Sequence, residues 1–143
     1  LKAFGCDVLG YDVALKEHRE IKMVSKVQLL ESADVITFHV PMTPETINML
    51  DDTFVRLVKK GVYIINTARG EILNEDALVM GIESKKIAGV AIDTFKKEPY
   101  QGPLVKYENV LLTAHMGSYA REARLKMECQ ALDNLLSSLG ESL

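Results

Sequence analysis

Short apolar runs alternate with amphipathic stretches along this chain of 143 residues. The runs are almost continuously apolar and do not alternate with polar residues, which is typical of parallel strands that are buried on both faces. The strands predicted in this way are Cys6–Tyr11, Val35–Val40, Val62–Asn66, Ala88–Asp93 and Val110–Thr113.

Helix signals fall between the predicted strands. Ser25, Asp51 and Asn74 each precede an amphipathic stretch, so we expect them to be N-caps. A long amphipathic helix is predicted from about Tyr119 to Leu139. This alternation of strands and helices favours an α/β fold with a parallel sheet that is covered on both faces.

Composition narrows the classes of function. The formal net charge is −3 with acids and bases interspersed, so we expect neither nucleic-acid binding nor membrane binding. The apolar runs are far shorter than a bilayer span. Cys6 and Cys129 lie far apart, and no Cys/His cluster has the spacing of a metal site. The sequence therefore predicts no metal and a reduced, cytoplasmic setting.

The N-terminal residues suggest a truncation. Leu1–Phe4 has the pattern of a last helical turn closed by Gly5, so we expect the chain to lack its natural beginning. Asp12 follows the first predicted strand. In a dinucleotide-binding βαβ unit, an acid at the end of the second strand binds the ribose hydroxyls, although many strand-end acids only form turns.

Three chemically active side chains follow three successive strands. Arg69, Glu98 and His115 come after the strands that end near Asn66, Asp93 and Thr113, respectively. Because ligands of parallel α/β sheets bind outside the carboxyl ends of the strands, these side chains are expected to converge on one crevice. An arginine that clamps a carboxylate, a histidine that moves a proton and a glutamate that tunes it suit acid–base chemistry.

Each of these residues also has an ordinary interpretation. Arg69 can be a solvated surface residue, Glu98 a loop acid, and His115 a partner of nearby backbone groups. The agreement of their strand-end positions favours the chemical interpretation over the ordinary ones. His39 is interpreted as structural or as lining the adenine side of the crevice, and His18 as solvated.

Long motifs resemble a known family. They are His39-Val-Pro-Met-Thr-Pro-Glu-Thr46, Gly61 to Gly70, Ala88 to Phe95 with Glu98-Pro99, and Thr113-Ala-His-Met-Gly117. In this order they resemble the NAD-binding domain of the D-isomer-specific 2-hydroxyacid dehydrogenases, over nearly the whole chain.

The resemblance implies a role for each site residue. Arg69 would bind the substrate carboxylate, His115 would be the acid–base residue, and Glu98 would favour its protonated form. The implied reaction is hydride transfer between NAD(H) and a D-2-hydroxy acid or 2-oxo acid, with 3-phosphoglycerate as the favoured substrate. The implied cofactor contacts are Asp12, Val40, Pro41, Thr67, Ala68, Asp93, His115 and Gly117.

The resemblance also implies an architecture. The fold would be a Rossmann-like, doubly wound parallel sheet whose first strand and glycine-rich loop are absent. Residues 1–143 would form a partial NAD-binding domain, in which 119–143 lead back toward a substrate domain. A homodimer formed through the nucleotide-binding domain is expected, and the chain alone is expected to be inactive.

Three other interpretations are weighed. Formate dehydrogenases share the fold but pair the histidine with a glutamine, so Glu98 argues against them. The C-terminal-binding corepressors use the same domain as an NAD-dependent interaction module and retain the three residues. An inactive paralogue that serves only in dimerisation is the third alternative.

Overall fold

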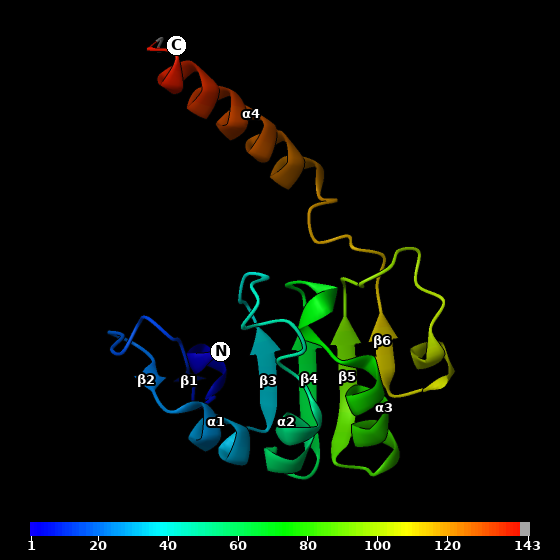
Figure 1. The fold of residues 1–143 in the computed structure, drawn as a ribbon. Helices are drawn as coiled ribbons and strands as arrows, with labels where there is room; N and C mark the ends of the chain where they lie inside the picture. Colours follow the sequence, from blue (N-terminus) through cyan, green and yellow to red (C-terminus); the bar gives the residue numbers. More distant parts are fainter. Residues whose placement is uncertain (141–143) are drawn as a thin grey trace.

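The computed structural model describes residues 1–140 as a parallel α/β domain with one projecting helix (Figure 1). The α-helices are α1 (Lys26–Ser32), α2 (Asp52–Leu57), α3 (Glu75–Glu83) and α4 (Arg121–Ser138). The strands are β1 (Leu9–Gly10), β2 (Lys22–Met23), β3 (Val35–Phe38), β4 (Val62–Asn66), β5 (Ile87–Ile92) and β6 (Val110–Leu112). Three short 3-10 helices are η1 (Lys2–Phe4), η2 (Gly70–Ile72) and η3 (Pro103–Lys106).

The strands form two parallel sheets. One sheet has the order β3-β4-β5-β6, and the other contains only β1 and β2. Among residues 1–140, β1 and β3 do not pair, so each lies at the edge of its sheet (Figure 1). The predicted Rossmann-like α/β fold is confirmed.

The predicted N-caps are confirmed. Ser25 accepts a hydrogen bond from the Gln28 amide, Asp51 from the Phe54 amide and Asn74 from the Ala77 amide. Each bond satisfies an N–H group that the first helical turn would otherwise leave without a partner. These helices begin at the capping residues and return the chain to the start of the next strand.

The core lies between the four-stranded sheet and helices α2 and α3. The side chains that point from β3 and β4 toward these helices are buried, as are the inner faces of the helices. Gly81 lets α3 approach the sheet, because a Cβ atom there would lie 2.5 Å from the Ile87 side chain. Burial of this apolar surface is the main source of stability in such a domain.

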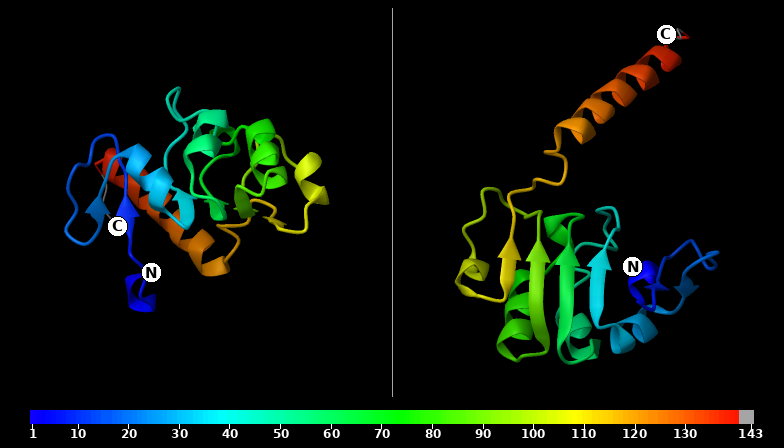
Figure 2. Two further views of the ribbon diagram at one scale, coloured as in Figure 1. Left: turned by 90° about the horizontal axis from the view of Figure 1, so that it is seen from below. Right: turned by 180° about the vertical axis from the view of Figure 1, so that it is seen from behind.

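The opposite face of the four-stranded sheet is uncovered by residues 1–140, which corrects the prediction that both faces are buried. Val35, Tyr63 and Leu111 on β3, β4 and β6 are 54%, 53% and 63% exposed. Figure 2 shows the sheet from this side, with α2 and α3 behind it. Apolar strand residues indicate burial on two faces, but in the described chain the helices that follow β3 and β4 lie on the same side.

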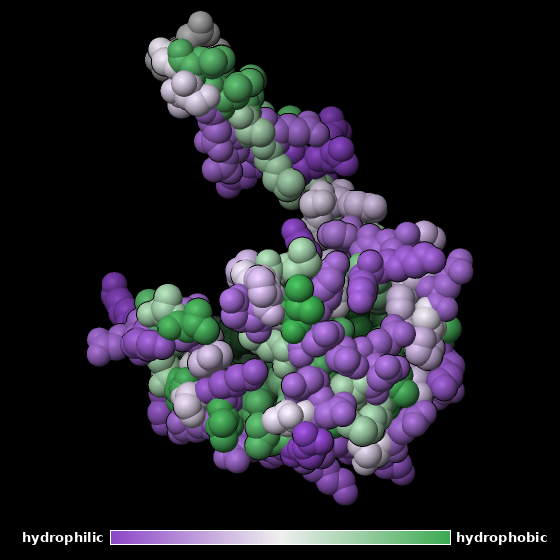
Figure 3. All heavy atoms as spheres, viewed as in Figure 1, coloured by the Kyte–Doolittle hydropathy of each residue, from purple (hydrophilic) through white to green (hydrophobic). Residues whose placement is uncertain are grey.

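Helix α4 projects away from the domain (Figures 1 and 2). None of its residues is buried, and its leucines are largely exposed along the shaft in Figure 3. The last three residues of the predicted segment 119–143 lie outside the described residues. Within residues 1–140, no helix combines the length and the apolar character that a membrane crossing requires.

Candidate active site

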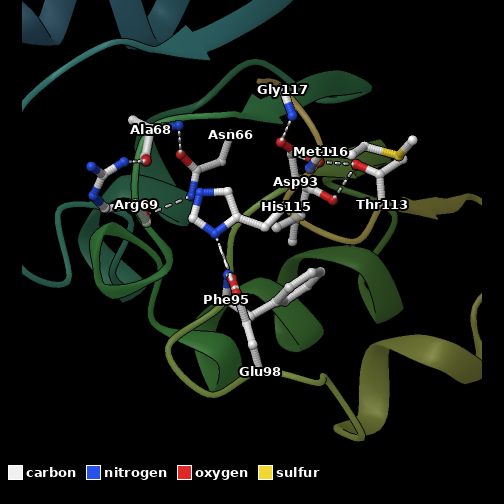
Figure 4. Close-up of polar contacts among 11 residues, drawn as sticks. Asn66, Ala68, Arg69, Asp93, Phe95, Glu98, Thr113, His115, Met116 and Gly117 are labelled. Carbon is white, nitrogen blue, oxygen red and sulfur yellow. Dashed lines mark hydrogen bonds and ion pairs between the residues drawn. The ribbon is translucent and has the colours of Figure 1, made fainter. Parts of the chain in front are cut away.

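The predicted catalytic residues gather at the carboxyl edge of the four-stranded sheet. Because β4, β5 and β6 are parallel neighbours, the segments that follow them begin side by side. Arg69 lies in the turn after β4, Glu98 in the loop after β5 and His115 in the turn after β6. Figure 4 shows the three side chains with the residues that hold them.

His115 and Glu98 form an ion pair. The imidazole Nδ1 lies 3.2 Å from each of the two Glu98 carboxylate oxygens. The Glu98 Oε1 also accepts the Phe95 amide, at 3.1 Å. This backbone hydrogen bond, followed by the bond to His115, lowers the pKa of Glu98. Glu98 is therefore ionised at neutral pH and faces the imidazole as an anion.

The geometry of the pair assigns the two ring nitrogens. When Nδ1–H donates to Glu98, Nε2 is left to exchange a proton with a ligand. The two side chains are 48% and 40% exposed, so water screens their attraction. The contribution of Glu98 thus lies in the orientation and tautomer of the imidazole more than in stability.

Asp93 braces the turn that carries His115. Its Oδ1 accepts the Thr113 hydroxyl at 2.5 Å and the Met116 amide at 3.0 Å, and its Oδ2 accepts the Gly117 amide at 3.1 Å. The bond from Thr113, followed by that from Met116, lowers the pKa of Asp93. His115 itself has φ of 52°, a left-handed conformation that is unfavourable for a residue with a side chain. The Asp93 carboxylate therefore holds His115 in a backbone conformation that it would otherwise leave.

Arg69 is placed by Asn66, the last residue of β4. The fully buried Asn66 side chain donates to the Arg69 carbonyl at 2.8 Å and accepts the Ala68 amide at 3.1 Å. The exposed Arg69 guanidinium donates from Nη1 to the Ala68 carbonyl at 2.7 Å. A guanidinium has five N–H donors, so this bond leaves donors for the two oxygens of a carboxylate ligand.

Asp12 lies just after β1, in the two-stranded sheet. Its Oδ1 accepts the amides of Ala14 and Leu15, at 2.8 and 2.9 Å. These bonds, led by that from Leu15, lower the pKa of Asp12 and keep it ionised. Among the described residues no group binds Oδ2, so this anionic oxygen is free to accept a hydroxyl of a ligand. The structure shows the turn-forming bonds of Asp12, and its binding of a ribose stays a prediction.

The remaining predicted cofactor contacts follow other strands. Val40 and Pro41 come after β3, where the Thr46 hydroxyl donates to the Pro41 carbonyl at 2.7 Å and fixes the loop. Thr67 is exposed and Ala68 half-buried, so the main chain after β4 is open to a ligand. Gly117 follows β6 and has its amide bound to Asp93. An anionic acceptor, small residues and open main chain along one edge fit an extended dinucleotide.

Other site types are absent from the described part of the chain. In residues 1–140, no three His, Cys, Asp or Glu side chains are grouped so that they could hold a metal ion. Cys6 and Cys129 are both exposed free thiols. His39 bonds through Nε2 to the Thr37 hydroxyl at 3.0 Å, at the end of β3.

Sequence reasoning missed several residues that support the site. They are Asn66, Gly70, Phe95 and Thr113, which contact the segments that carry the three predicted catalytic side chains. Asn66 had a visible signal, because a polar residue that ends a buried apolar strand needs a hydrogen-bond partner. The amide of Phe95 has no sequence signal, since any residue can supply it.

The chain is similar to a reductase and a dehydrogenase of known name. It is 36% identical over 146 residues to a glyoxylate reductase of Thermofilum pendens and 39% identical over 140 residues to a D-3-phosphoglycerate dehydrogenase of Bacillus subtilis. These alignments cover 97% and 94% of this chain but only 43% and 27% of the relatives.

A solved structure matches as well. An acyclic imino acid reductase in complex with NADPH and D-Arg superposes with a TM-score of 0.90 at 28% identity, covering 97% of this chain and 45% of that one. The chain thus spans less than half the length of these relatives and of this neighbour. Their descriptions as reductases and a dehydrogenase give no support to the interaction-module alternative.

A family model covers most of the chain and agrees with the motifs described above. It matches residues 1–117, from the N-terminus through the turn that carries His115. This chain belongs to the NAD-binding domain family of the D-isomer specific 2-hydroxyacid dehydrogenases.

Proposed function

We propose that the full-length protein is an NAD-dependent oxidoreductase that transfers a hydride between NAD(H) and a D-2-hydroxy acid or its 2-oxo acid. The observation that carries this proposal is the His115–Glu98 pair, with Nδ1 3.2 Å from both carboxylate oxygens and Nε2 left free. A histidine held in this way is suited to general acid–base catalysis.

The chain's own residues would divide the work. Bound NAD(H) supplies the acceptor or donor of the hydride. His115 takes the hydroxyl proton at Nε2 during oxidation and returns it during reduction, while Glu98 stabilises the imidazolium. Arg69 binds the substrate carboxylate and polarises the oxygen on carbon 2.

The cofactor would lie along the carboxyl edge of the strands. Asp12 would accept the ribose hydroxyls with its free Oδ2, because Oδ1 is occupied by backbone amides. Asp93 and Gly117 would line the nicotinamide end through the braced turn after β6. The contacts between these ends would come from Val40, Pro41, Thr67, Ala68 and His115.

Small acids with a group on carbon 2 are the substrate class that Arg69 and His115 suit. The names of the relatives point to glyoxylate and 3-phosphoglycerate, and 3-phosphoglycerate is the substrate we favour. We further infer a cytoplasmic homodimer that associates through this domain. The exposed apolar face around Tyr63 supports association, which light scattering of the purified full-length protein would test.

The activity is tested by following NADH oxidation by the full-length protein with glyoxylate, pyruvate and a phosphorylated 2-oxo acid. His115→Ala should reduce kcat by about 10²–10⁴-fold, the usual worth of acid–base catalysis. Arg69→Ala should raise KM for the acid while NADH affinity is kept. A wild-type protein that binds NADH but reduces none of the acids would instead point to an interaction module.

A further inference from the structure

The turn that carries Arg69 is fixed on several sides. From below, the buried Asn66 side chain bridges the Ala68 amide and the Arg69 carbonyl. On one flank, the amide of Asn48 donates to the Glu71 carbonyl at 2.8 Å, and that of Leu50 to the Ile72 carbonyl at 3.0 Å. The turn is thus part of the rigid domain and not a free loop.

Gly70 closes the other flank by a contact between main chains. A Cβ atom at this position would lie 2.2 Å from the carbonyl carbon of Phe95 and 2.3 Å from the amide nitrogen of Lys96. Ordinary contacts of a Cβ atom begin at 3.4 Å, and both neighbours are backbone atoms that cannot rotate aside. Any side chain at Gly70 would therefore push the two segments apart by about 1 Å, the scale of misplacement that costs activity.

The segment that Gly70 touches is the one that holds Glu98. The amide of Phe95 donates to the Glu98 Oε1 at 3.1 Å, and the same carboxylate binds the His115 imidazole. Contacts therefore run without interruption from Arg69 through Gly70 and Phe95 to the Glu98–His115 pair.

We infer that Asn66 and Gly70 are positioning residues that set the separation between the arginine that binds the substrate carboxylate and the acid–base pair. This inference rests on the proposed function, because the separation matters for a substrate that both groups must reach. Asn66, at the end of β4, holds the Arg69 turn by hydrogen bonds. Because Gly70 has no side chain, this turn can lie close to the loop that carries Glu98.

The test is Gly70→Ala in the full-length protein. A misplacement of about 1 Å costs roughly 10²-fold in rate, so kcat/KM for the 2-oxo acid should fall by about that factor, with a rise in KM. The Kd for NADH should change much less than kcat/KM, because the predicted cofactor contacts at Asp12, Val40 and Pro41 lie on other loops. The pH–rate profile should also shift to lower pH, because Glu98 would move away from the imidazole.

Gly89→Ala is the matched control. A Cβ atom there would lie 3.0 Å from the ring of Tyr63, an exposed side chain that can move, and 3.3 Å from the Asn109 carbonyl oxygen, a far milder approach than at Gly70; the site is inside β5, away from its carboxyl end. This variant should retain the wild-type kinetics and pH profile.

A second variant, Asn66→Ala, covers the case in which Gly70→Ala does not fold. It removes both bonds to the Arg69 turn and should likewise raise KM for the acid, with a smaller effect on NADH binding, which arises because Ala68 in the same turn is a predicted cofactor contact. The NMR signals of the His115 ring, which contacts Glu98, should change in Gly70→Ala but not in Asn66→Ala, and this readout needs no turnover. If the wild type is active and neither variant alters KM or the pH profile, the positioning role is refuted. If the wild type is inactive, the proposed function fails, and unchanged NMR signals of the His115 ring in Gly70→Ala would separately overturn the inference.

Discussion

Asp93→Asn is the substitution that most directly tests how the His115 turn is held. The wild-type carboxylate accepts three hydrogen bonds, from the Thr113 hydroxyl and the amides of Met116 and Gly117. Asparagine keeps the shape but replaces one oxygen by an NH2 group. That group would face an N–H donor, so at least one bond is lost and the others lose the assistance of the charge.

The magnitude follows from these bonds and from the conformation of His115. Hydrogen bonds to a charged group contribute about 1.5–3 kcal/mol each and neutral ones about 1. The total contribution of the hydrogen bonds from residue 93 to the His115 turn therefore falls from roughly 5–9 to about 2 kcal/mol. The left-handed backbone of His115, with φ of 52°, costs about 1–2 kcal/mol. The remaining margin is near zero, so the turn would be in place only about half of the time, and kcat should fall by about twofold.

The assay compares kcat, KM and the Kd for NADH in the full-length wild type and variant. Thr113→Val is the control, because it removes only the hydroxyl bond and leaves both amides bound to the carboxylate. Its effect on kcat should be smaller than that of Asp93→Asn. If Asp93→Asn weakened NADH binding but left kcat intact, the Asp93 carboxylate would act on the cofactor, and its role in holding the His115 turn would be refuted.

Four further predictions concern other residues of the site and the chain as a whole. Glu98→Gln should move the pH–rate profile to lower pH, because the anion that stabilises the imidazolium is lost; an unchanged profile would separate Glu98 from catalysis. NADH should be preferred to NADPH in kcat/KM, because Asp12 repels a 2′-phosphate, and equal values would remove Asp12 from the ribose. The pKa of Asp93 is lowered in the folded protein, mainly by the Thr113 hydroxyl. The Asp93 carboxylate therefore stabilises the folded protein fully above the pKa of about 3.9 that it has in the unfolded chain, and this stabilisation is lost as pH falls through the lower pKa of the folded protein. The NMR signals of Met116 and Gly117 should therefore broaden in wild type below about pH 4, whereas Asp93→Asn should show no such step. The 143-residue chain alone should neither bind NADH tightly nor turn over a 2-oxo acid, and micromolar affinity in a titration would contradict this.

Local signals were sufficient for the central part of the fold. The caps at Ser25, Asp51 and Asn74 were readable because each bond joins residues three positions apart. The range Val62–Asn66 was predicted without error, since a β-branched run between Gly61 and a turn has few alternatives. The first predicted strand was too long: only Leu9–Gly10 pairs, because its partner β2 is equally short.

Features that depend on distant partners were not readable. Val27, an apolar residue in the first turn of α1, is 49% exposed, which the sequence alone does not indicate. The strand-end positions of Arg69, Glu98 and His115 were predictable because parallel strands share one carboxyl edge. The left-handed turn of His115 was not, because it depends on a carboxylate more than twenty positions earlier in the chain.

Because β1 and β3 do not pair, the strands form two sheets, and this has a consequence for hydrogen–deuterium exchange. β4 and β5 have a strand on each side, whereas β3 and β1 each have one neighbour within residues 1–140. Backbone amides with strand partners on both sides open only with the whole domain, while those near an edge open locally. Exchange in the isolated chain should therefore be slowest in β4 and β5 and faster toward β3, β1 and β2. Arg69 and Glu98 thus follow the strands that are expected to open most slowly. Asp12 follows β1, which is expected to be among the strands that open fastest.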